Sequence, residues 1–167
     1  MGRSTLGQAR LAILALSFAA ACGSSSFDGG VFRNEQLAFR VGPMPDGWHR
    51  IETDAALLAF RSDDASATIA VNGRCGLDGD DVPLEALTHH LFIHFRAREL
   101  IEQKHIDLDG RAALRSELTA ELDGVDKHYV VYVLKKDGCV YDFMHVSPNG
   151  AGAGAFERFV QGFRTLP

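Results

Sequence analysis

The sequence lacks several features that would define its class at once. It has no hydrophobic run long enough to span a bilayer, and its 17 basic residues are outnumbered by 22 acidic ones, giving a net charge of -5. A membrane-spanning bundle is therefore excluded, and the acidic balance argues against a nucleic-acid partner held by phosphate neutralisation. Disorder is excluded as well, because 46% of the 167 residues are hydrophobic. This length fits one folded domain.

Motifs for local chemistry are also missing. The sequence contains no GxSxG nucleophile motif, no glycine-rich phosphate loop and no dinucleotide-binding fingerprint. None of its three cysteines stands in a cysteine-protease signature. We therefore expect a non-catalytic protein that uses no cofactor.

The first 21 residues have the layout of a secretory signal peptide. Arg3 and Arg10 precede an apolar stretch at residues 11–21, and no acidic residue accompanies them. As a helix this stretch would cover ~16 Å of the roughly 30 Å of bilayer hydrocarbon, so it cannot be a stable membrane span. We expect residues 1–21 to be removed on export.

The end of this signal resembles the lipobox of bacterial lipoproteins. Three alanines at residues 19–21 precede Cys22, and the resemblance implies that this cysteine becomes the lipidated N-terminus. Gly23 follows where an aspartate would imply inner-membrane retention, so the resemblance implies a lipid anchor in the outer membrane, facing the periplasm. Residues 22–36 are then the lipidated cysteine and a flexible tether, and residues 37–167 the single domain. The alternative is an ordinary signal peptide with an incidental cysteine.

Alternating hydrophobicity predicts β-strands over most of the domain. Short strands are expected around Phe39, Trp48, Phe60 and Ile69, separated by turn-forming residues. Longer strands follow, and three Asp-Gly pairs predict that they form an antiparallel meander. These pairs stand at residues 109–110, 123–124 and 137–138.

The last Asp-Gly pair also predicts a register. If it is a two-residue hairpin turn, Tyr132 lies opposite Phe143, and Val130 lies opposite His145. Both faces of this hairpin are largely apolar. The sheet therefore needs cover on both sides.

Two helices can supply this cover. Leucine and phenylalanine residues recur at helical spacing from a cap at Asp81 to about Gln103. Near the C-terminus, an aromatic stripe from Phe156 to Phe163 predicts a second helix. The predicted fold class is therefore α+β, with an antiparallel β-sheet sandwiched between helices in an α/β/α arrangement.

A short motif in the first strands resembles the PsbP-like fold. Its residues are Phe39, Val41, Pro45, Gly47 and Trp48. The order of elements extends this resemblance over residues 37–166, and it implies the same antiparallel sheet between helices, as in the DcrB-like lipoproteins. Such proteins mostly serve as binding or assembly subunits, so the resemblance implies a binding role and carries over no catalytic residues.

Cys75 and Cys139 remain once Cys22 is assigned to the lipid. An exported domain lies in an oxidising compartment, where two remaining thiols usually pair. Each cysteine stands at the end of a predicted strand, where a bridge can form. We predict a disulfide between them. The alternative is a free nucleophilic cysteine activated by one of the seven histidines.

One histidine pair is a candidate metal site. His90 and His94 are four residues apart on the predicted helix, which is the spacing that zinc ligands use on helices. No glutamate stands between them, although zinc hydrolases carry one there. The alternative is that these histidines flank the apolar stripe and face solvent.

Two groups with acidic residues are further candidates. One resembles the start of a calcium-binding loop, lacks the later ligands, and comprises Asp78, Asp80 and Asp81. The other alternates along one face of a predicted strand and comprises His105, Asp107 and Asp109. A solvated loop and a half-exposed strand would produce the same two patterns.

Together these features favour a lipid-anchored envelope protein that binds or helps to assemble another envelope component. Its expected partners are the membrane, reached through the anchor, and an envelope protein. The alternative is a small hydrolase or metal-binding protein that uses histidine and acidic residues in a groove between sheet and helix. A carrier that binds a small apolar ligand on the sheet face is a third hypothesis.

Overall fold

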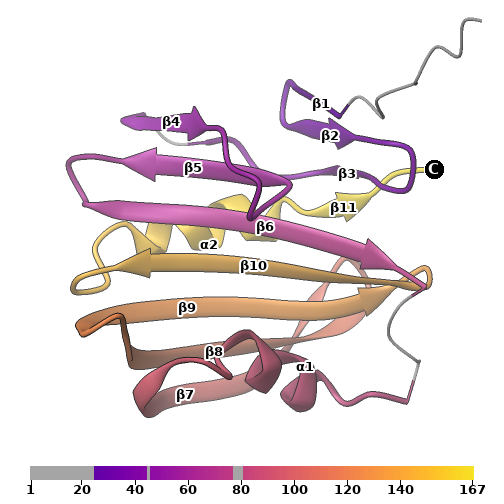
Figure 1. The fold of residues 1–167 in the computed structure, drawn as a ribbon. Helices are drawn as coiled ribbons and strands as arrows, with labels where there is room; N and C mark the ends of the chain where they lie inside the picture. Colours follow the sequence, from indigo (N-terminus) through magenta and orange to yellow (C-terminus); the bar gives the residue numbers. More distant parts are fainter. Residues whose placement is uncertain (1–24, 45, 77–80) are drawn as a thin grey trace, which may run out of the picture.

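The computed structural model describes residues 25–44, 46–76 and 81–167, which form two antiparallel sheets and two helices (Figure 1). The strands are β1 (Ser26–Asp28), β2 (Val31–Arg33), β3 (Ala38–Arg40), β4 (Trp48–Ile51), β5 (Leu58–Ser62), β6 (Ala67–Cys75), β7 (Arg96–Leu108), β8 (Arg111–Leu122), β9 (Val125–Lys136), β10 (Cys139–Ser147) and β11 (Arg164–Thr165). The helices are α1 (Leu84–Leu91) and α2 (Ala153–Gln161). Neither helix in these described ranges is long and apolar enough to cross a membrane.

The larger sheet has seven strands in the order β4-β5-β6-β10-β9-β8-β7. Strands β7 to β10 form the predicted meander. Asp109, Asp123 and Asp137, with the glycines after them, have positive φ angles, as type I′ hairpin turns require. The register of the last hairpin is also confirmed, since Tyr132 pairs with Phe143 and the second expected pair follows in the same ladder.

The smaller sheet has the order β1-β2-β3-β11 and brings the C-terminal strand beside the N-terminal ones. Phe32 is fully buried, with its ring 5.0 Å from that of Phe39, and the ring of Phe27 lies 5.6 Å from that of Phe60. Over residues 25–36, these contacts correct the prediction of a flexible tether, which spanned residues 22–36. The strands β1 and β2 belong to the domain because their aromatic side chains pack into its core.

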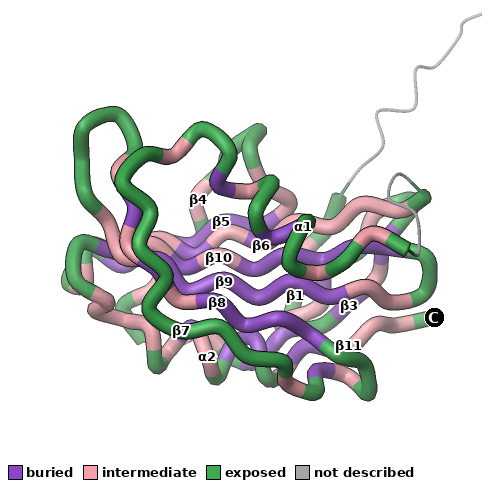
Figure 2. Tube along the Cα trace, turned by 90° about the horizontal axis from the view of Figure 1, so that it is seen from below, coloured by how far each residue is buried: buried purple, intermediate pink, exposed green. Residues whose placement is uncertain are grey.

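One face of the large sheet is covered by α2 together with the smaller sheet. Phe156, Phe159 and Phe163 are fully buried, and the ring of Phe163 lies 5.0 Å from that of Tyr141. The predicted C-terminal helix with its aromatic stripe is therefore confirmed. Figure 2 shows the resulting core, with burial along β8, β9 and β10 and exposure along β7.

The opposite face is covered by α1, which packs on β8 and β9. This helix ends at Leu91, so the prediction of a helix reaching about Gln103 is wrong. Residues from Arg96 onward are mostly good helix formers, but their backbone pairs with β8 instead, and tertiary pairing overrides propensity. The predicted layers are corrected as well: a short helix lies on one face, and a helix with a second sheet lies on the other (Figure 1).

Strand β7 is irregular. Its pairing with β8 shifts register between Arg96 and Glu99 and again between Leu100 and Glu102. Ala97, within the first shift, has a positive φ of 44°. Two residues of this strand carry large exposed apolar side chains: Leu100 is 58% exposed and Ile101 is 54% exposed.

Cys75 and Cys139 lie directly opposite each other in the β6–β10 ladder and form a disulfide, as expected from the sequence. The bond joins residues 64 positions apart. Neither sulfur is a free thiol, so the alternative of a nucleophilic cysteine at these positions is excluded. The bridge fastens β10, the last strand of the meander, to β6, the strand that precedes α1.

Candidate functional site

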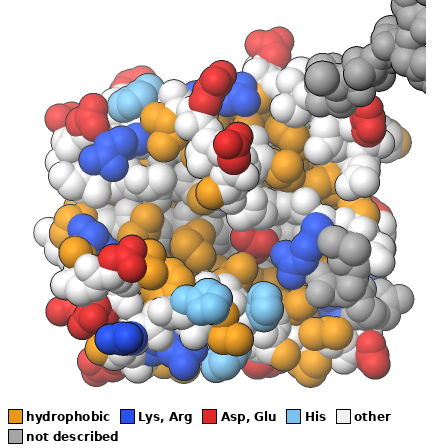
Figure 3. All heavy atoms as spheres, in the orientation of Figure 1, with side chains coloured by type: hydrophobic (Ala, Val, Ile, Leu, Met, Phe, Trp, Pro, Cys, Tyr) orange, Lys and Arg blue, Asp and Glu red, His pale blue; other side chains and the backbone are white. Residues whose placement is uncertain are grey.

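A groove runs between α1 and the strands β7 and β8. Its volume is about 440 Å³, within the range of small-molecule sites. Figure 3 looks onto this face of the molecule, where histidine side chains gather beside hydrophobic ones. Ala86 and Phe92 from the helix side, with Leu100 and Leu118 from the strands, make most of the groove apolar.

The helix wall of the groove follows from helical spacing. Glu85, Thr88 and Phe92 recur at intervals of three and four residues, so they share one face of α1 and the turn after it. Thr88 is only 5% exposed, and its buried Oγ1 has no hydrogen-bond partner in the described part of the chain. A buried hydroxyl without a partner is unfavourable, which distinguishes this wall from ordinary packing.

The strand wall follows from the β7–β8 pairing. Leu100 lies opposite Leu118, and Gln103 lies opposite Ser116. The side chain of Gln103 donates a hydrogen bond of 2.9 Å to the Ser116 hydroxyl, which places a paired polar couple in the apolar wall.

The two ends of the groove carry charged groups. At one end, Arg98 donates to the carbonyl oxygen of Phe92 at 3.2 Å, and the same Nη1 lies 3.3 Å from Nε2 of His89. At the other end, the carboxylate of Glu85 lies 3.1 Å from Nε2 of His105. The groove can therefore hold an apolar group while its ends select for charge.

The predicted metal ligands do not come together. His90 stands on α1 beside a different cavity from the one that His94 lines, and His94 lies beyond the end of the helix. The two histidines are therefore not one turn apart on a single helix, as the predicted metal site required. Within the described ranges, no three histidine, cysteine, aspartate or glutamate side chains gather as metal ligands.

The other predicted residues have separate places. Cys22 lies outside the described residues, as do Asp78 and Asp80. Asp109 binds Lys136 Nζ at 2.6 Å and accepts the Thr165 backbone N–H at 2.8 Å.

Asp109 thereby ties the β7–β8 turn to β11. Burial raises the pKa of Asp109, but the bonds from Lys136 and Thr165 outweigh it and hold this pKa below its usual value. This carboxylate thus has a structural role. Of its expected strand neighbours, His105 pairs with Glu85, and Asp107 accepts the Gly110 N–H at 3.3 Å.

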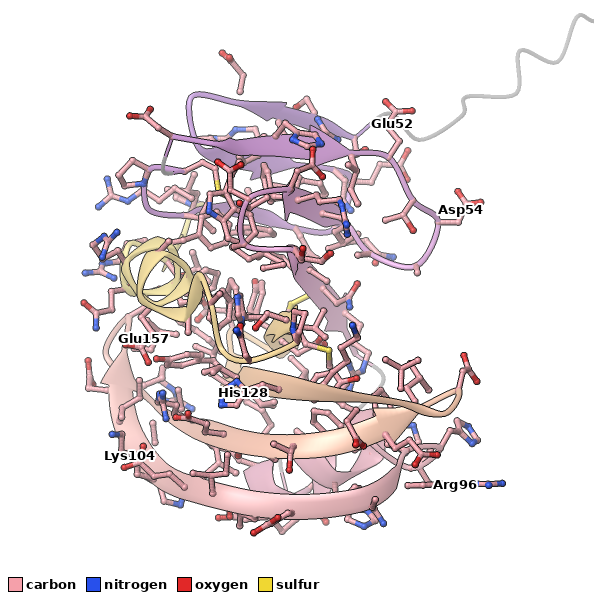
Figure 4. All side chains as sticks on the ribbon, turned by 90° about the vertical axis from the view of Figure 1, so that its left-hand side faces the viewer. Glu52, Asp54, Arg96, Lys104, His128 and Glu157 are labelled. Atoms are coloured by element: carbon pink, nitrogen blue, oxygen red, sulfur yellow. A yellow bond between two sulfur atoms is a disulfide. The ribbon has the colours of Figure 1, made fainter. Side chains whose placement is uncertain are left out.

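A second polar cluster lies on the α2 side of the sheet. Arg115 is 8% exposed, and its guanidinium binds Glu157 at 2.7 Å, Glu102 at 2.8 Å and Glu117 at 2.9 Å. Glu117 also lies 3.0 Å from Nε2 of His128. Figure 4 shows His128 on the sheet and Glu157 on α2, so the cluster bridges the two layers.

Its electrostatics indicate an ion network that fastens α2 to the sheet. Burial raises the pKa of Glu117, but the hydrogen bonds and charges of Arg115 and His128 outweigh it and hold this pKa below the usual value. Histidine and acidic side chains do therefore meet between sheet and helix, as the hydrolase alternative requires. Here the Arg115 guanidinium binds the three carboxylates and so ties α2 to the sheet.

His145 neighbours this cluster and gives a testable pH dependence. The side chain is fully buried, and its Nε2 lies 3.1 Å from the carbonyl oxygen of Ala151. Burial lowers its pKa from 6.5 to about 4. Because the unfolded chain binds the proton more readily, stability is complete above pH 6.5 and falls as the pH drops toward 4.

We expect His145→Phe to remove this part of the acid sensitivity. Between pH 6.5 and 4, the wild type should lose roughly 2 to 3 kcal/mol more unfolding free energy than the variant. Urea unfolding at several pH values measures the difference. Parallel losses in the two proteins would contradict the assignment.

Comparisons with solved structures identify the fold. The sequence matches no protein-family profile and no curated protein. Solved structures do match: LpqN of Mycobacterium tuberculosis, described as involved in cell envelope biogenesis, has a TM-score of 0.56 and 13% identity over 86% of this chain and 90% of its own. Cyanobacterial PsbP (CyanoP) of Synechocystis has a TM-score of 0.55 and 14% identity over 92% and 99%.

A Pseudomonas aeruginosa protein of unknown function matches at a TM-score of 0.53 and 11% identity, over 87% of this chain and 98% of its own. At these identities the similarity shows the fold alone. The chain therefore has a PsbP-like fold, in agreement with the motif around Trp48.

Sequence reasoning did not find the groove residues. Thr88 and Leu100 belong to no motif, and Arg98 lies in a segment predicted as helix. One signal was present: Leu100 and Ile101 are adjacent apolar residues amid charged ones, which fits neither a solvated helix face nor a regular strand.

Proposed function

We propose that this chain is a lipid-anchored protein of the cell envelope that binds another envelope component and catalyses no reaction. The export signal and the lipobox-like segment ending at Cys22 support the location. The similarity in fold to LpqN, a protein described as involved in envelope biogenesis, agrees with it. The lipid anchor would lie in the outer membrane, with the folded domain facing the periplasm.

The groove beside α1 carries the binding part of this proposal. It combines apolar walls with charged ends, a composition suited to recognition, and the histidines His90 and His94 lie apart from each other. The envelope component would place an apolar group against Leu100 and Leu118.

One experiment in a Gram-negative host tests both parts. The full chain is produced with a photo-reactive amino acid at position 100, and a control carries it at Asp54, an exposed residue far from the groove (Figure 4). We expect a cross-linked adduct from position 100 alone, lost when Ala86→Trp fills the groove. Mass spectrometry should find acyl chains on Cys22. An unmodified, soluble chain contradicts the anchor, and equal adducts from both positions contradict the site.

A further inference from the structure

The α1 groove holds a polar group that the packing of this chain leaves unsatisfied. The Thr88 hydroxyl lies in the groove wall, its side chain is buried, and no donor or acceptor among the described residues pairs with its Oγ1. The neighbouring polar couple of Gln103 and Ser116 is paired. An unpaired hydroxyl beside a cavity is therefore a point where a ligand can bond.

Arg98 supplies a positive charge at one end of the same groove. Its partners are the carbonyl oxygen of Phe92 and the ring nitrogen Nε2 of His89, and no carboxylate in the described part of the chain forms an ion pair with it. A guanidinium in this setting matches a carboxylate ligand. Glu85, at the other end, is already paired with His105 and would repel a second anion.

The space between these ends suits a single extended chain. Helix α1 has eight residues and is therefore ~12 Å long, about the extended length of a ten-carbon acyl chain. Its groove face and the facing strands present Ala86, Phe92, Leu100 and Leu118. Leu100 is exposed at 58%, so a chain lying here would cover apolar surface that is now in water.

We propose that the groove binds a medium-chain fatty acid, with its carboxylate at Arg98 and its chain along α1 toward Glu85. This inference rests on the proposed function and names the chemistry of the component bound. The Thr88 hydroxyl donates to the carboxylate after rotation of its side chain. One negative charge matches Arg98, whereas a phosphate head carries a greater charge and would find no second lysine or arginine among the residues that line the groove.

The test uses calorimetry on the chain from Gly23 onward, which contains all the described elements. Decanoate is compared with decanol, decyltrimethylammonium and decyl phosphate, which carry the same chain on other head groups. We expect decanoate to bind with a single site and the others to bind more weakly. Arg98→Gln should weaken decanoate binding about tenfold, and Arg96→Gln, a matched change outside the groove, should leave it unchanged.

Thr88→Val separates a ligand-binding role from a structural one. The variant should raise the melting temperature of the ligand-free chain, because it removes the unpaired hydroxyl, and should weaken decanoate binding. If the hydroxyl had only a structural role, its removal would change the melting temperature without weakening decanoate binding.

The inference would be overturned if decanoate did not bind. It would also be overturned if decanol or decyl phosphate bound as tightly as decanoate, or if the two arginine variants had equal effects. The position 100 adduct distinguishes the two proposals. If that adduct persists while decanoate does not bind, the binding function stands and the fatty acid is wrong. If both are absent, both proposals fail.

Discussion

Replacing Gly162 with alanine is expected to destabilise the domain by at least about 3 kcal/mol. Gly162 follows α2 and has an ordinary φ of -77°, so backbone conformation does not require glycine there. The reason is contact: a Cβ at this position would clash with the backbone Cα and N of Gly42. That approach is held by a 2.8 Å hydrogen bond from the Gly42 N–H to the carbonyl oxygen of Phe159.

Neither backbone can yield easily, because each is tied into another element. The chain before Gly42 forms β3, which pairs with β11 just after Gly162. Gly154→Ala, within α2, is the matched control: its Cβ would meet only the far end of Arg158, at 3.9 Å, and it should stabilise by ~0.5 to 1 kcal/mol. Urea unfolding measures both. A Gly162→Ala protein within ~1 kcal/mol of the wild type would contradict the packing argument.

Replacing Arg115 with methionine should cost on the order of 3 kcal/mol at neutral pH, at the lower end of what breaking a fully buried pair costs. The change leaves Glu102, Glu117 and Glu157 close together without the cation that binds all three. The three carboxylates are 26% to 46% exposed, so water screens part of their mutual repulsion, but all of them lose the buried cation that they share.

The pH dependence of this cost has a definite sign. In the wild type, the lowered pKa of Glu117 contributes stability that is present above pH 4.5 and is lost as the pH falls through the lowered value. Without Arg115, the carboxylates prefer to be protonated, so the deficit of the variant should shrink on acidification. A deficit that grows below pH 4.5 would contradict the network.

Two comparisons isolate the ion network from general effects of arginine removal. Arg61→Met removes a guanidinium from an exposed pair with Asp63, where the side chains are 44% and 77% exposed, and should cost less than ~1 kcal/mol. Adding Glu157→Gln should stabilise the Arg115→Met protein, although the same change alone destabilises the wild type.

The parts of the fold that could be predicted are those set by local residues. Asp-Gly turns fix a hairpin and its register within a few positions, which is why the pair Tyr132 and Phe143 was predictable. The aromatic spacing of α2 is equally local. The disulfide followed from the cysteine count and the expected compartment, and the structure adds that the two residues face each other in one ladder.

The parts that could not be predicted depend on distant partners. The segment around Phe27 and Phe32 is rich in glycine and serine, and only its packing on Phe39 and Phe60 makes it a pair of strands. The residues of β7 favour a helix individually, and pairing with β8 decides otherwise. Thr88 was beyond prediction for the same reason: an unpaired hydroxyl is visible only when its surroundings are known.

The register shifts in β7 determine where the large sheet stops. This strand is an outer edge and has 13 residues, and a long regular edge invites a strand from another molecule. At each shift the extra residue breaks the even spacing of the backbone groups. Charged side chains such as Glu99 and Lys104 flank the breaks. A second molecule beside this edge would therefore find no ladder that is continuous over the whole strand, and the regular part that it could pair with shrinks to Glu102–Leu108.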